Sequence, residues 1–256
     1  MKDSDSQVVL STRDIRKSFG NKEILRGIDV DVKKGEHIAI IGPSGSGKST
    51  FIRCLNLLET PNAGTITLNG ETVFDASQKT SHHAIRNLRK RVGMVFQSFN
   101  LFSTHSAIEN VSLAQRLALN RSKDEAAARS EALLERVGLK DHLHKLPGQL
   151  SGGQQQRVAI ARSLALDPEV ILFDEPTSAI DPEMRVEVLK VMKELAEGGM
   201  TMMMVTHEIQ FAKDAADRVM FLADGEVLES GESAQVLTDP SNQRLRRFME
   251  ALSGAI

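Results

Sequence analysis

The sequence predicts an α/β protein: a parallel-sheet core, an antiparallel β unit near the amino end and a helical insertion in the middle. Short apolar runs recur along the 256 residues and alternate with segments of helical periodicity, which is typical of a parallel sheet buried on both faces. A glycine-rich loop follows the first of these buried runs and precedes a helical segment. We therefore expect one domain over residues 1–256, with the helical insertion at about residues 98–165.

Two segments predict the antiparallel unit. Residues 7–33 contain short apolar runs broken by Gly20 and Gly27, which indicates strands joined by turns. Residues 65–70 alternate between polar and apolar and end in Asn69-Gly70, a dipeptide typical of tight hairpin turns. We expect the two segments to share one antiparallel sheet.

Five short apolar runs predict the buried strands of the parallel sheet. They span residues 37–41, 92–96, 170–173, 200–205 and 219–222.

Four segments are expected to be helical. The first, residues 48–58, follows the glycine-rich loop. The second, residues 122–138, begins with a serine cap and an acidic first turn and stops at a glycine. A third helix is expected over residues 154–166, and a fourth begins at Asp-Pro and ends at Gly-Gly within residues 181–199.

Composition excludes several classes of protein. The net charge is −2 and 26% of residues are charged, which argues against a nucleic-acid binder that works by bulk electrostatics. The basic run 86–91 is interpreted as a solvated helix face. Cys54 is the single cysteine, so no intrachain disulfide is possible, and we expect it to fill core space. No signal peptide is visible and no apolar run reaches the length of a membrane span, so other chains are expected to supply any membrane passage.

The glycine-rich loop GPSGSGKST, residues 42–50, fits the phosphate-binding pattern G-x-x-x-x-G-K-[ST]. Its glycines allow backbone N–H groups to wrap a phosphate, and the following helix N-terminus adds positive potential. We expect Lys48 to reach the outer phosphates and Ser49 to ligate Mg²⁺. The candidate nucleotide-binding residues are Gly42, Pro43, Ser44, Gly45, Ser46, Gly47, Lys48, Ser49 and Thr50.

Polar residues at three strand ends complete the predicted catalytic site. Asp174 and Glu175 end the run 170–173, where alternation points neighbouring side chains to opposite faces. We expect Asp174 to hold Mg²⁺, directly or through water, and Glu175 to act as general base. Gln97 is a candidate Mg²⁺ ligand or water-positioning group. His207 is a candidate catalytic residue, with a structural histidine as the alternative.

These motifs, in this order and spacing, resemble those of ATP-binding cassette (ABC) ATPases. GPSGSGKST resembles Walker A, Gln97 the Q-loop, LSGGQQQR (residues 150–157) the family signature, ILFDEP Walker B, SAID (residues 178–181) the D-loop and His207 the switch histidine. The resemblance implies a P-loop NTPase with a RecA-like core and a helical signature subdomain, hydrolysing ATP with Mg²⁺. Lys48, Glu175, Gln97 and His207 are its implied catalytic residues.

The resemblance also implies a head-to-tail homodimer, with each ATP between the P-loop of one chain and the signature of the other. The implied nucleotide contacts across that interface are Ser151, Gly152, Gly153, Gln154 and Asp181. Asp181 also occupies a helix N-cap position, and both roles are compatible. Phe19 is implied to stack on adenine, while a core phenylalanine at a strand end is the alternative.

The similarity is closest to ATP-binding subunits of polar amino acid importers. It implies uptake through separate transmembrane permease subunits, served indirectly by a substrate-binding protein, with this chain peripheral at the cytoplasmic face of the cell membrane. The alternative is a soluble ABC ATPase of DNA repair or translation, but the chain lacks a tandem cassette, long coiled coils and a basic surface, so no nucleic-acid partner is expected. Ser103-Thr104 and Ile180 depart from the subfamily pattern.

Overall fold

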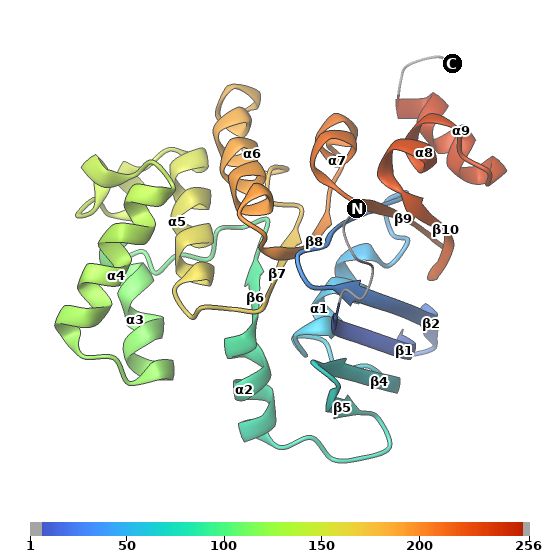
Figure 1. Cartoon of the computed structure of the whole chain (residues 1–256), viewed down its shortest axis with the longest axis horizontal. Coiled ribbons are helices and arrows are strands. Elements are labelled where there is room, and N and C mark those ends of the chain that lie inside the picture. Colours follow the sequence, from blue (N-terminus) through green and yellow to red (C-terminus); the bar gives the residue numbers. More distant parts are fainter. Residues whose placement is uncertain (1–6, 253–256) are drawn as a thin grey trace.

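The computed structural model describes residues 7–252 and contains two β-sheets flanked by helices (Figure 1). The antiparallel sheet has the order β2-β1-β4-β5, and the larger sheet has the order β10-β9-β3-β8-β7-β6. Strands of the antiparallel sheet are β1 (Val8–Phe19), β2 (Lys22–Lys33), β4 (Ala63–Leu68) and β5 (Glu71–Asp75). Strands of the larger sheet are β3 (His37–Ile41), β6 (Val92–Val95), β7 (Val170–Asp174), β8 (Thr201–Val205), β9 (Arg218–Ala223) and β10 (Glu226–Glu232).

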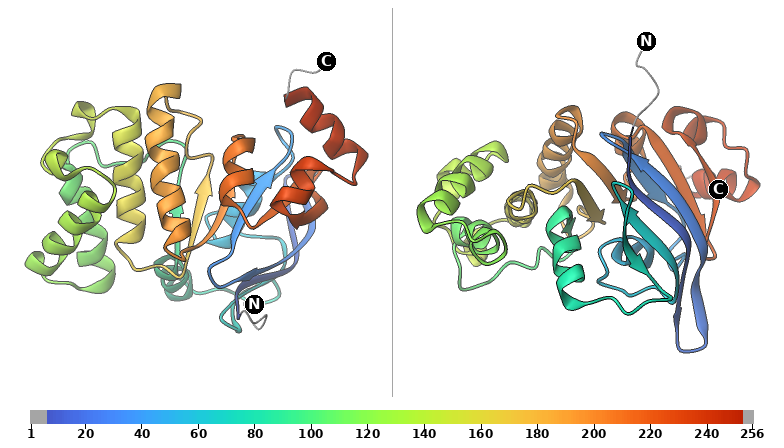
Figure 2. Two further views of the ribbon diagram at one scale, coloured as in Figure 1. Left: turned by 45° about the horizontal axis from the view of Figure 1, so that its top comes forward. Right: turned by 60° about the horizontal axis from the view of Figure 1, so that its bottom comes forward.

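Nine α-helices lie within the described residues, and two short 3₁₀ turns at Lys140–His142 and Pro147–Gln149 precede α5. The helices are α1 (Lys48–Leu55), α2 (His82–Arg91), α3 (Ala107–Leu119), α4 (Lys123–Arg136), α5 (Gly152–Leu164), α6 (Pro182–Glu197), α7 (Ile209–Ala215), α8 (Ser233–Thr238) and α9 (Gln243–Leu252). Helices α3, α4 and α5, here called the helical unit, gather on the side away from β1 and β2 (Figures 1 and 2).

The larger sheet divides the core into two hydrophobic clusters. Along β8, Met202 and Met204 belong to the cluster that contains the helical unit and α6, whereas Met203 faces the cluster of α1 and the antiparallel sheet. This alternation follows from the two-residue period of a strand. All five predicted buried strands are therefore confirmed, and the predicted fold class is confirmed with them.

The antiparallel sheet confirms one predicted turn and corrects another. Asn69 and Gly70 both have positive φ, as a type I′ hairpin turn between β4 and β5 requires. Gly27, predicted to break two strands, instead lies inside β2 with φ of 94°. A Cβ there would lie 2.7 Å from an Asp14 oxygen on the bulged part of β1, so the glycine accommodates a bulge.

Strand β10 pairs antiparallel with β9 and was not predicted from the sequence. The turn that joins them, Asp224-Gly225, contacts both sheets. The N–H of Gly225 donates to the Ser46 carbonyl in the glycine-rich loop (3.1 Å), and the Gly225 carbonyl accepts from the Arg26 N–H in β2 (2.9 Å). The turn thus fixes the loop relative to the antiparallel sheet.

Helix α1 is shorter than predicted. It ends at Leu55 rather than near Leu58, because Leu57 adopts a left-handed conformation that an α-helix excludes. The guanidinium of Arg89 on α2 donates to the Asn56 and Leu57 carbonyls at 3.2 and 2.7 Å. These bonds satisfy carbonyls that the terminated helix leaves free.

The insertion contains the two predicted helices, as α4 and α5, and a third helix, α3, that was not predicted. A reciprocal pair of hydrogen bonds between Ser122 and Glu125 starts α4, and Ser106 starts α3 in the same way. Helix α5 begins at Gly152, two residues before the predicted start, because Ser151 caps it. The basic run 86–91 lies on α2 and buries Leu88 only, which confirms the solvated helix face.

Candidate active site

A cavity of about 300 Å³ opens beside the glycine-rich loop, at the carboxyl end of β3. Seven consecutive residues, Ser44–Thr50, line it together with Glu175 at the end of β7. Phe19, Lys22 and Ile24, from the hairpin of β1 and β2, complete the lining. The carboxyl edge is where open α/β sheets bind ligands.

Lys48 places a buried positive charge at the base of this cavity. Its side chain is 5% exposed, and its Nζ donates to the carbonyl oxygens of Gly42 (2.8 Å) and Pro43 (2.9 Å). Burial lowers the pKa of Lys48, and the carboxylates of Glu175 and Asp174 oppose that shift. The ammonium group lies at the first residue of α1, where the helix dipole adds positive potential.

Two loop positions require glycine for reasons that the structure shows. Gly42 has φ of 147°, and a Cβ there would collide with the Leu222 carbonyl oxygen of β9. Gly47 has φ of 105°, and its Cβ would lie 2.8 Å from the Leu25 side chain. Both glycines therefore allow the loop to pack closely on its own fold.

Asp174 ends β7 with 2% of its surface exposed. Its Oδ2 accepts from two guanidinium nitrogens of Arg53 on α1, Nε at 2.9 Å and Nη2 at 2.8 Å. Its Oδ1 is buried and has no hydrogen-bond partner within residues 7–252. One oxygen of the carboxylate is therefore held by Arg53, and the other is a buried acceptor without a partner in a residue that does not line the cavity itself.

Glu175 and His207, which the sequence predicts as separate candidates, lie side by side. The Nε2 of His207 is 3.4 Å from Oε1 of Glu175. Glu175 adopts a left-handed conformation, φ 49°, and its N–H donates to the Val205 carbonyl of β8 at 3.0 Å. Such a conformation is costly for a residue other than glycine and is characteristic of functional sites. It places the side chain in the cavity wall.

The residues of the site fit a magnesium ion. Mg²⁺ is usually held by one or two carboxylates, substrate phosphates and waters, and the unpartnered Oδ1 of Asp174 supplies such a carboxylate oxygen. Ser49, the second residue of α1, lines the cavity. Gln97, the third predicted ligand, lies beyond the end of β6, is exposed and does not line the cavity.

The signature residues are separate from this cavity. None of Ser151, Gly152, Gly153 and Gln154 lines it, and they form the first turn of α5. A Cβ on Gly153 would lie 3.1 Å from the Met184 side chain and carbonyl on α6, whereas Gly152 leaves its nearest neighbours at 3.6 Å or more. Packing within the chain thus explains Gly153, whereas a Cβ on Gly152 would make only ordinary contacts with Phe99 and the Ala179 carbonyl.

Three further predicted positions are informative. Phe19 is 48% exposed, so the alternative of a core phenylalanine is wrong. Asp181 occupies the N-cap position of α6, but its side chain makes no capping hydrogen bond, which leaves the carboxylate for another partner. Ile180, a departure from the subfamily pattern, is buried in the core cluster as an apolar residue.

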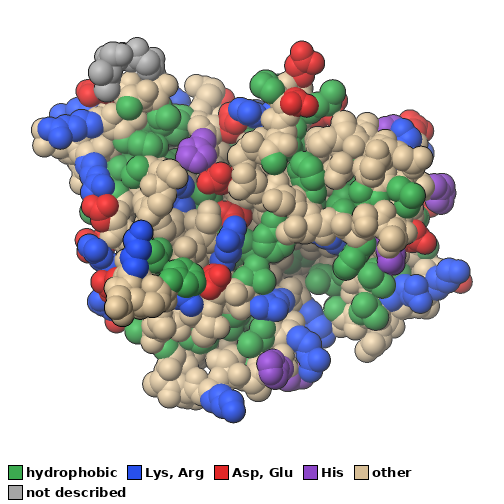
Figure 3. All heavy atoms as spheres, turned by 180° about the vertical axis from the view of Figure 1, so that it is seen from behind, with side chains coloured by type: hydrophobic (Ala, Val, Ile, Leu, Met, Phe, Trp, Pro, Cys, Tyr) green, Lys and Arg blue, Asp and Glu red, His purple; other side chains and the backbone are tan. Residues whose placement is uncertain are grey.

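A groove of about 510 Å³ separates α2 from the helical unit. Arg86, Arg89 and Lys90 of α2 line one side, and Leu117 of α3, 75% exposed, lines the other. Figure 3 shows this face: basic side chains and histidine gather over α2 at the lower edge of a hollow, beside hydrophobic side chains of the helical unit. Phe102, between β6 and α3, is also half exposed.

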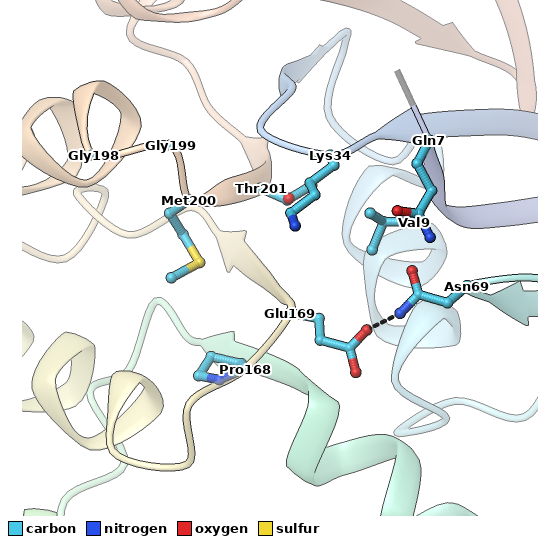
Figure 4. Close-up of a pocket in the computed structure, with 10 residues that line it drawn as sticks. All are labelled: Gln7, Val9, Lys34, Asn69, Pro168, Glu169, Gly198, Gly199, Met200 and Thr201. Atoms are coloured by element: carbon cyan, nitrogen blue, oxygen red, sulfur yellow. Dashed lines mark hydrogen bonds between the residues drawn. The ribbon is translucent and has the colours of Figure 1, made fainter. Parts of the chain in front are cut away.

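A further cavity, of about 420 Å³, lies at the amino ends of β7 and β8 (Figure 4). Glu169 and Thr201 mark this edge, and Lys34 and Asn69 line the cavity from the antiparallel side, with a hydrogen bond from Asn69 to Glu169. The cavity is at the opposite edge of the sheet from the glycine-rich loop. It is therefore distinct from the candidate active site.

Several residues of the site were not predicted from the sequence. Lys22 and Ile24 line the cavity, and Arg53 holds Asp174. Gln156 and Arg162 of α5 bind the backbone beside Gln97. Gln156 lies within the LSGGQQQR motif, but the motif does not indicate which backbone it binds, and no motif marks the other contacts, because each depends on tertiary packing between elements far apart in the chain.

Comparisons with known proteins agree with this geometry. The family model described as ABC transporter matches residues 25–178. A probable amino-acid ABC transporter ATP-binding protein of Haemophilus influenzae is 49% identical over 94% of both chains. The L-cystine import ATP-binding protein TcyC of Bacillus subtilis is 48% identical over 95% of this chain and 98% of that one.

Among solved structures, the dimeric post-hydrolysis state of the ATP-binding cassette MJ0796, bound to ADP and Pi, superposes with a TM-score of 0.77. It is 34% identical and covers 88% of this chain and 98% of its own. Within residues 7–252, no helix combines the length and apolarity needed to cross a membrane.

Proposed function

Because the chain belongs to the ABC transporter family, we propose that it is the ATP-hydrolysing subunit of an importer for a polar amino acid or a related solute. The observation that carries the proposal is the cavity beside the glycine-rich loop, where Lys48 supplies charge and Glu175 approaches from a neighbouring strand end. The L-cystine importer subunit among the relatives supports the substrate class. Neither relative supports the soluble alternative.

The chain's own residues account for the chemistry. The N–H groups of the glycine-rich loop and the ammonium of Lys48 bind the phosphates and stabilise negative charge that develops during phosphoryl transfer. Glu175 accepts a proton from the attacking water, and His207 at 3.4 Å orients its carboxylate. Phe19, exposed at the cavity rim, offers an aromatic face to the adenine.

Magnesium would be held by Ser49 and Asp174, with Gln97 reaching the site when its segment moves toward the cavity. When bound, the ion would supply positive charge that offsets the negative charge of the phosphates. The unpartnered Oδ1 of Asp174 supports this assignment.

A dimer would bring the signature to the active site. The signature lies apart from the cavity of its own chain, and the relative cassette of known structure is dimeric with ADP and Pi bound. The first turn of α5 ends in free N–H groups that suit a phosphate. We therefore place Ser151, Gly152, Gly153, Gln154 and Asp181 against the nucleotide of a second copy.

The mass of the Glu175→Gln variant in solution tests this arrangement. We expect a monomer without nucleotide and a dimer with Mg²⁺-free ATP, because the substitution keeps ATP bound. Adding Ser151→Phe should prevent the dimer, since the larger side chain occupies the space of the phosphate, whereas Gln78→Phe on an exposed turn should not. A dimer that persists with Ser151→Phe would exclude the signature from the interface.

The groove between α2 and the helical unit is the proposed contact for membrane permease subunits. It combines an exposed leucine with three cationic side chains of α2. Exposed apolar residues rimmed by charge are typical of protein interfaces. This contact would place the chain at the cytoplasmic face of the membrane, with a substrate-binding protein reached only through the permease.

A charge change in the groove tests this contact. We expect Leu117→Glu to reduce the fraction of the chain that sediments with host-cell membranes by at least about tenfold, the worth of about 1.4 kcal/mol, and to leave ATP hydrolysis in solution unchanged. The matched control is Ala128→Glu on the exposed side of α4, which should sediment like the unmodified chain. Equal sedimentation of both variants would place the membrane contact elsewhere.

A further inference from the structure

Helix α5 holds the backbone on both sides of Gln97. The Nε2 of Gln156 donates to the Phe96 carbonyl at 3.0 Å. The guanidinium of Arg162 donates to the next carbonyls along the segment, Phe99 at 3.0 Å and Asn100 at 2.6 Å. Three carbonyls within five residues are therefore fixed to one helix, and Gln97 lies between them.

Arg162 is a half-buried arginine whose guanidinium has two backbone carbonyls and, within the described residues, no carboxylate as partners. It forms no ion pair with any residue that the structure describes, and burial alone lowers its pKa. Removing a charged group from water costs free energy unless hydrogen bonds to the protein replace those to water. Here two backbone carbonyls do so, which indicates that the segment and the helix are fitted to each other.

Gln156 is likewise committed to this contact. Its side chain is fully buried, and its Nε2 donates a hydrogen bond to the Phe96 carbonyl. Its Oε1 has no hydrogen-bond partner within residues 7–252. The ring of Phe99 lies 3.6 Å from where a Cβ of Gly152 would be. The segment therefore also touches the first turn of α5, where the signature begins.

The rest of the segment has little support of its own. Residues 96–106 form no helix or strand, and their far end is held by Asn110 of α3, whose amide binds the Phe102 and His105 backbone. Gln97 and Ser98 make no side-chain hydrogen bond with the described part of the chain. The position of Gln97 is thus set by residues of α5 and α3 and not by its own contacts.

We propose that Gln156 and Arg162 are positioning residues that hold the backbone of the Gln97 segment on helix α5 and thereby set where Gln97 lies relative to the active site. The inference rests on the proposed roles of Gln97 and of the signature in ATP hydrolysis. Three hydrogen bonds from these two side chains to backbone carbonyls hold the segment. Neither residue lines the cavity beside the glycine-rich loop.

The first experiment measures the contact without nucleotide. A nitroxide label is attached at Ser98→Cys, an exposed site. Cys54 is not labelled, because it is fully buried and burial raises its pKa to about 12. We expect Arg162→Met to increase the mobility of the label in the electron spin resonance spectrum. The matched control, Arg129→Met on α4, should leave the spectrum unchanged, and no change with Arg162→Met would overturn the proposal.

The second experiment measures ATP hydrolysis in the unlabelled chain. We expect Arg162→Met to lower kcat by about 10- to 100-fold with KM for ATP unchanged, the usual cost of misplacing a catalytic group. Arg162→Lys should recover part of the loss. A mobile label with unchanged kcat would refute the link to catalysis and leave the ATPase assignment standing.

Folding is checked by urea unfolding of each variant. Where Arg162→Met does not fold, Gln156→Met, which keeps the length of the side chain, takes its place in both experiments. If the unmodified chain hydrolyses no ATP, the proposed function fails, whereas the label experiment still decides whether α5 holds the segment.

Discussion

Replacing Glu175 with glutamine is expected to slow ATP hydrolysis by about 10²–10⁴, the usual contribution of a general base, and to leave ATP binding intact. The amide keeps the size of the side chain and its place in the cavity wall but cannot accept the proton from water. Because the residue is held in a left-handed conformation by its N–H bond to Val205, the substitution should leave the backbone in place. Single-turnover hydrolysis and equilibrium binding of labelled ATP, measured on one preparation, separate the two effects.

The matched control for Glu175→Gln is Glu131→Gln on the exposed face of α4, which makes the same change of charge away from the site. It should hydrolyse ATP at the rate of the unmodified chain. A rate near that of the unmodified chain in Glu175→Gln would show that another group activates the water, and His207 would then be the first to examine.

Replacing Lys48 with alanine is expected to reduce ATP turnover by at least about 10²–10³, the scale for loss of one preorganised donor. The variant loses the buried cation and the two hydrogen bonds that hold the Gly42 and Pro43 carbonyls. ATP binding should weaken as well, because the charge acts on the phosphates before and during transfer. Equilibrium binding and steady-state hydrolysis measure the two losses.

Loss of folding must be separated from loss of binding in Lys48→Ala. Thermal unfolding and the far-ultraviolet circular dichroism spectrum should match those of Lys79→Ala, an exposed lysine in the loop before α2. Normal hydrolysis in a folded Lys48→Ala chain would refute the assignment of the glycine-rich loop as the phosphate site.

The elements of the fold that depend on neighbouring residues in the sequence could be predicted. Short stretches of sequence determine the buried strands, the cap of α4, the start of α6 at Asp181-Pro182 and the Asn69-Gly70 turn, and each is found in the structure. Strand β10 and the end of α1 were missed because they depend on neighbours in space. Leu57 ends α1 in a conformation that its own residue type does not favour, and the guanidinium of Arg89 from α2 stabilises that end.

In the candidate active site, too, some residues could be predicted from local sequence and others could not. Residues named by motif, such as Lys48 and Glu175, lie where the sequence places them, around one cavity. The residues that hold the motifs in position were not predictable. Arg53 and Arg162 act through the Asp174 carboxylate and through backbone carbonyls, and an arginine on a helix carries no local sign of such partners.

The Asp224-Gly225 turn has a practical consequence for anyone who wishes to engineer this chain. A two-residue hairpin turn at the surface is normally a preferred place to splice in a fluorescent reporter or to open new termini. Here the Gly225 backbone is hydrogen-bonded to Ser46 and to Arg26. An insertion at this turn would therefore displace the glycine-rich loop. The exposed stretch around Gln78 bonds only within its own turn and is the better splice point.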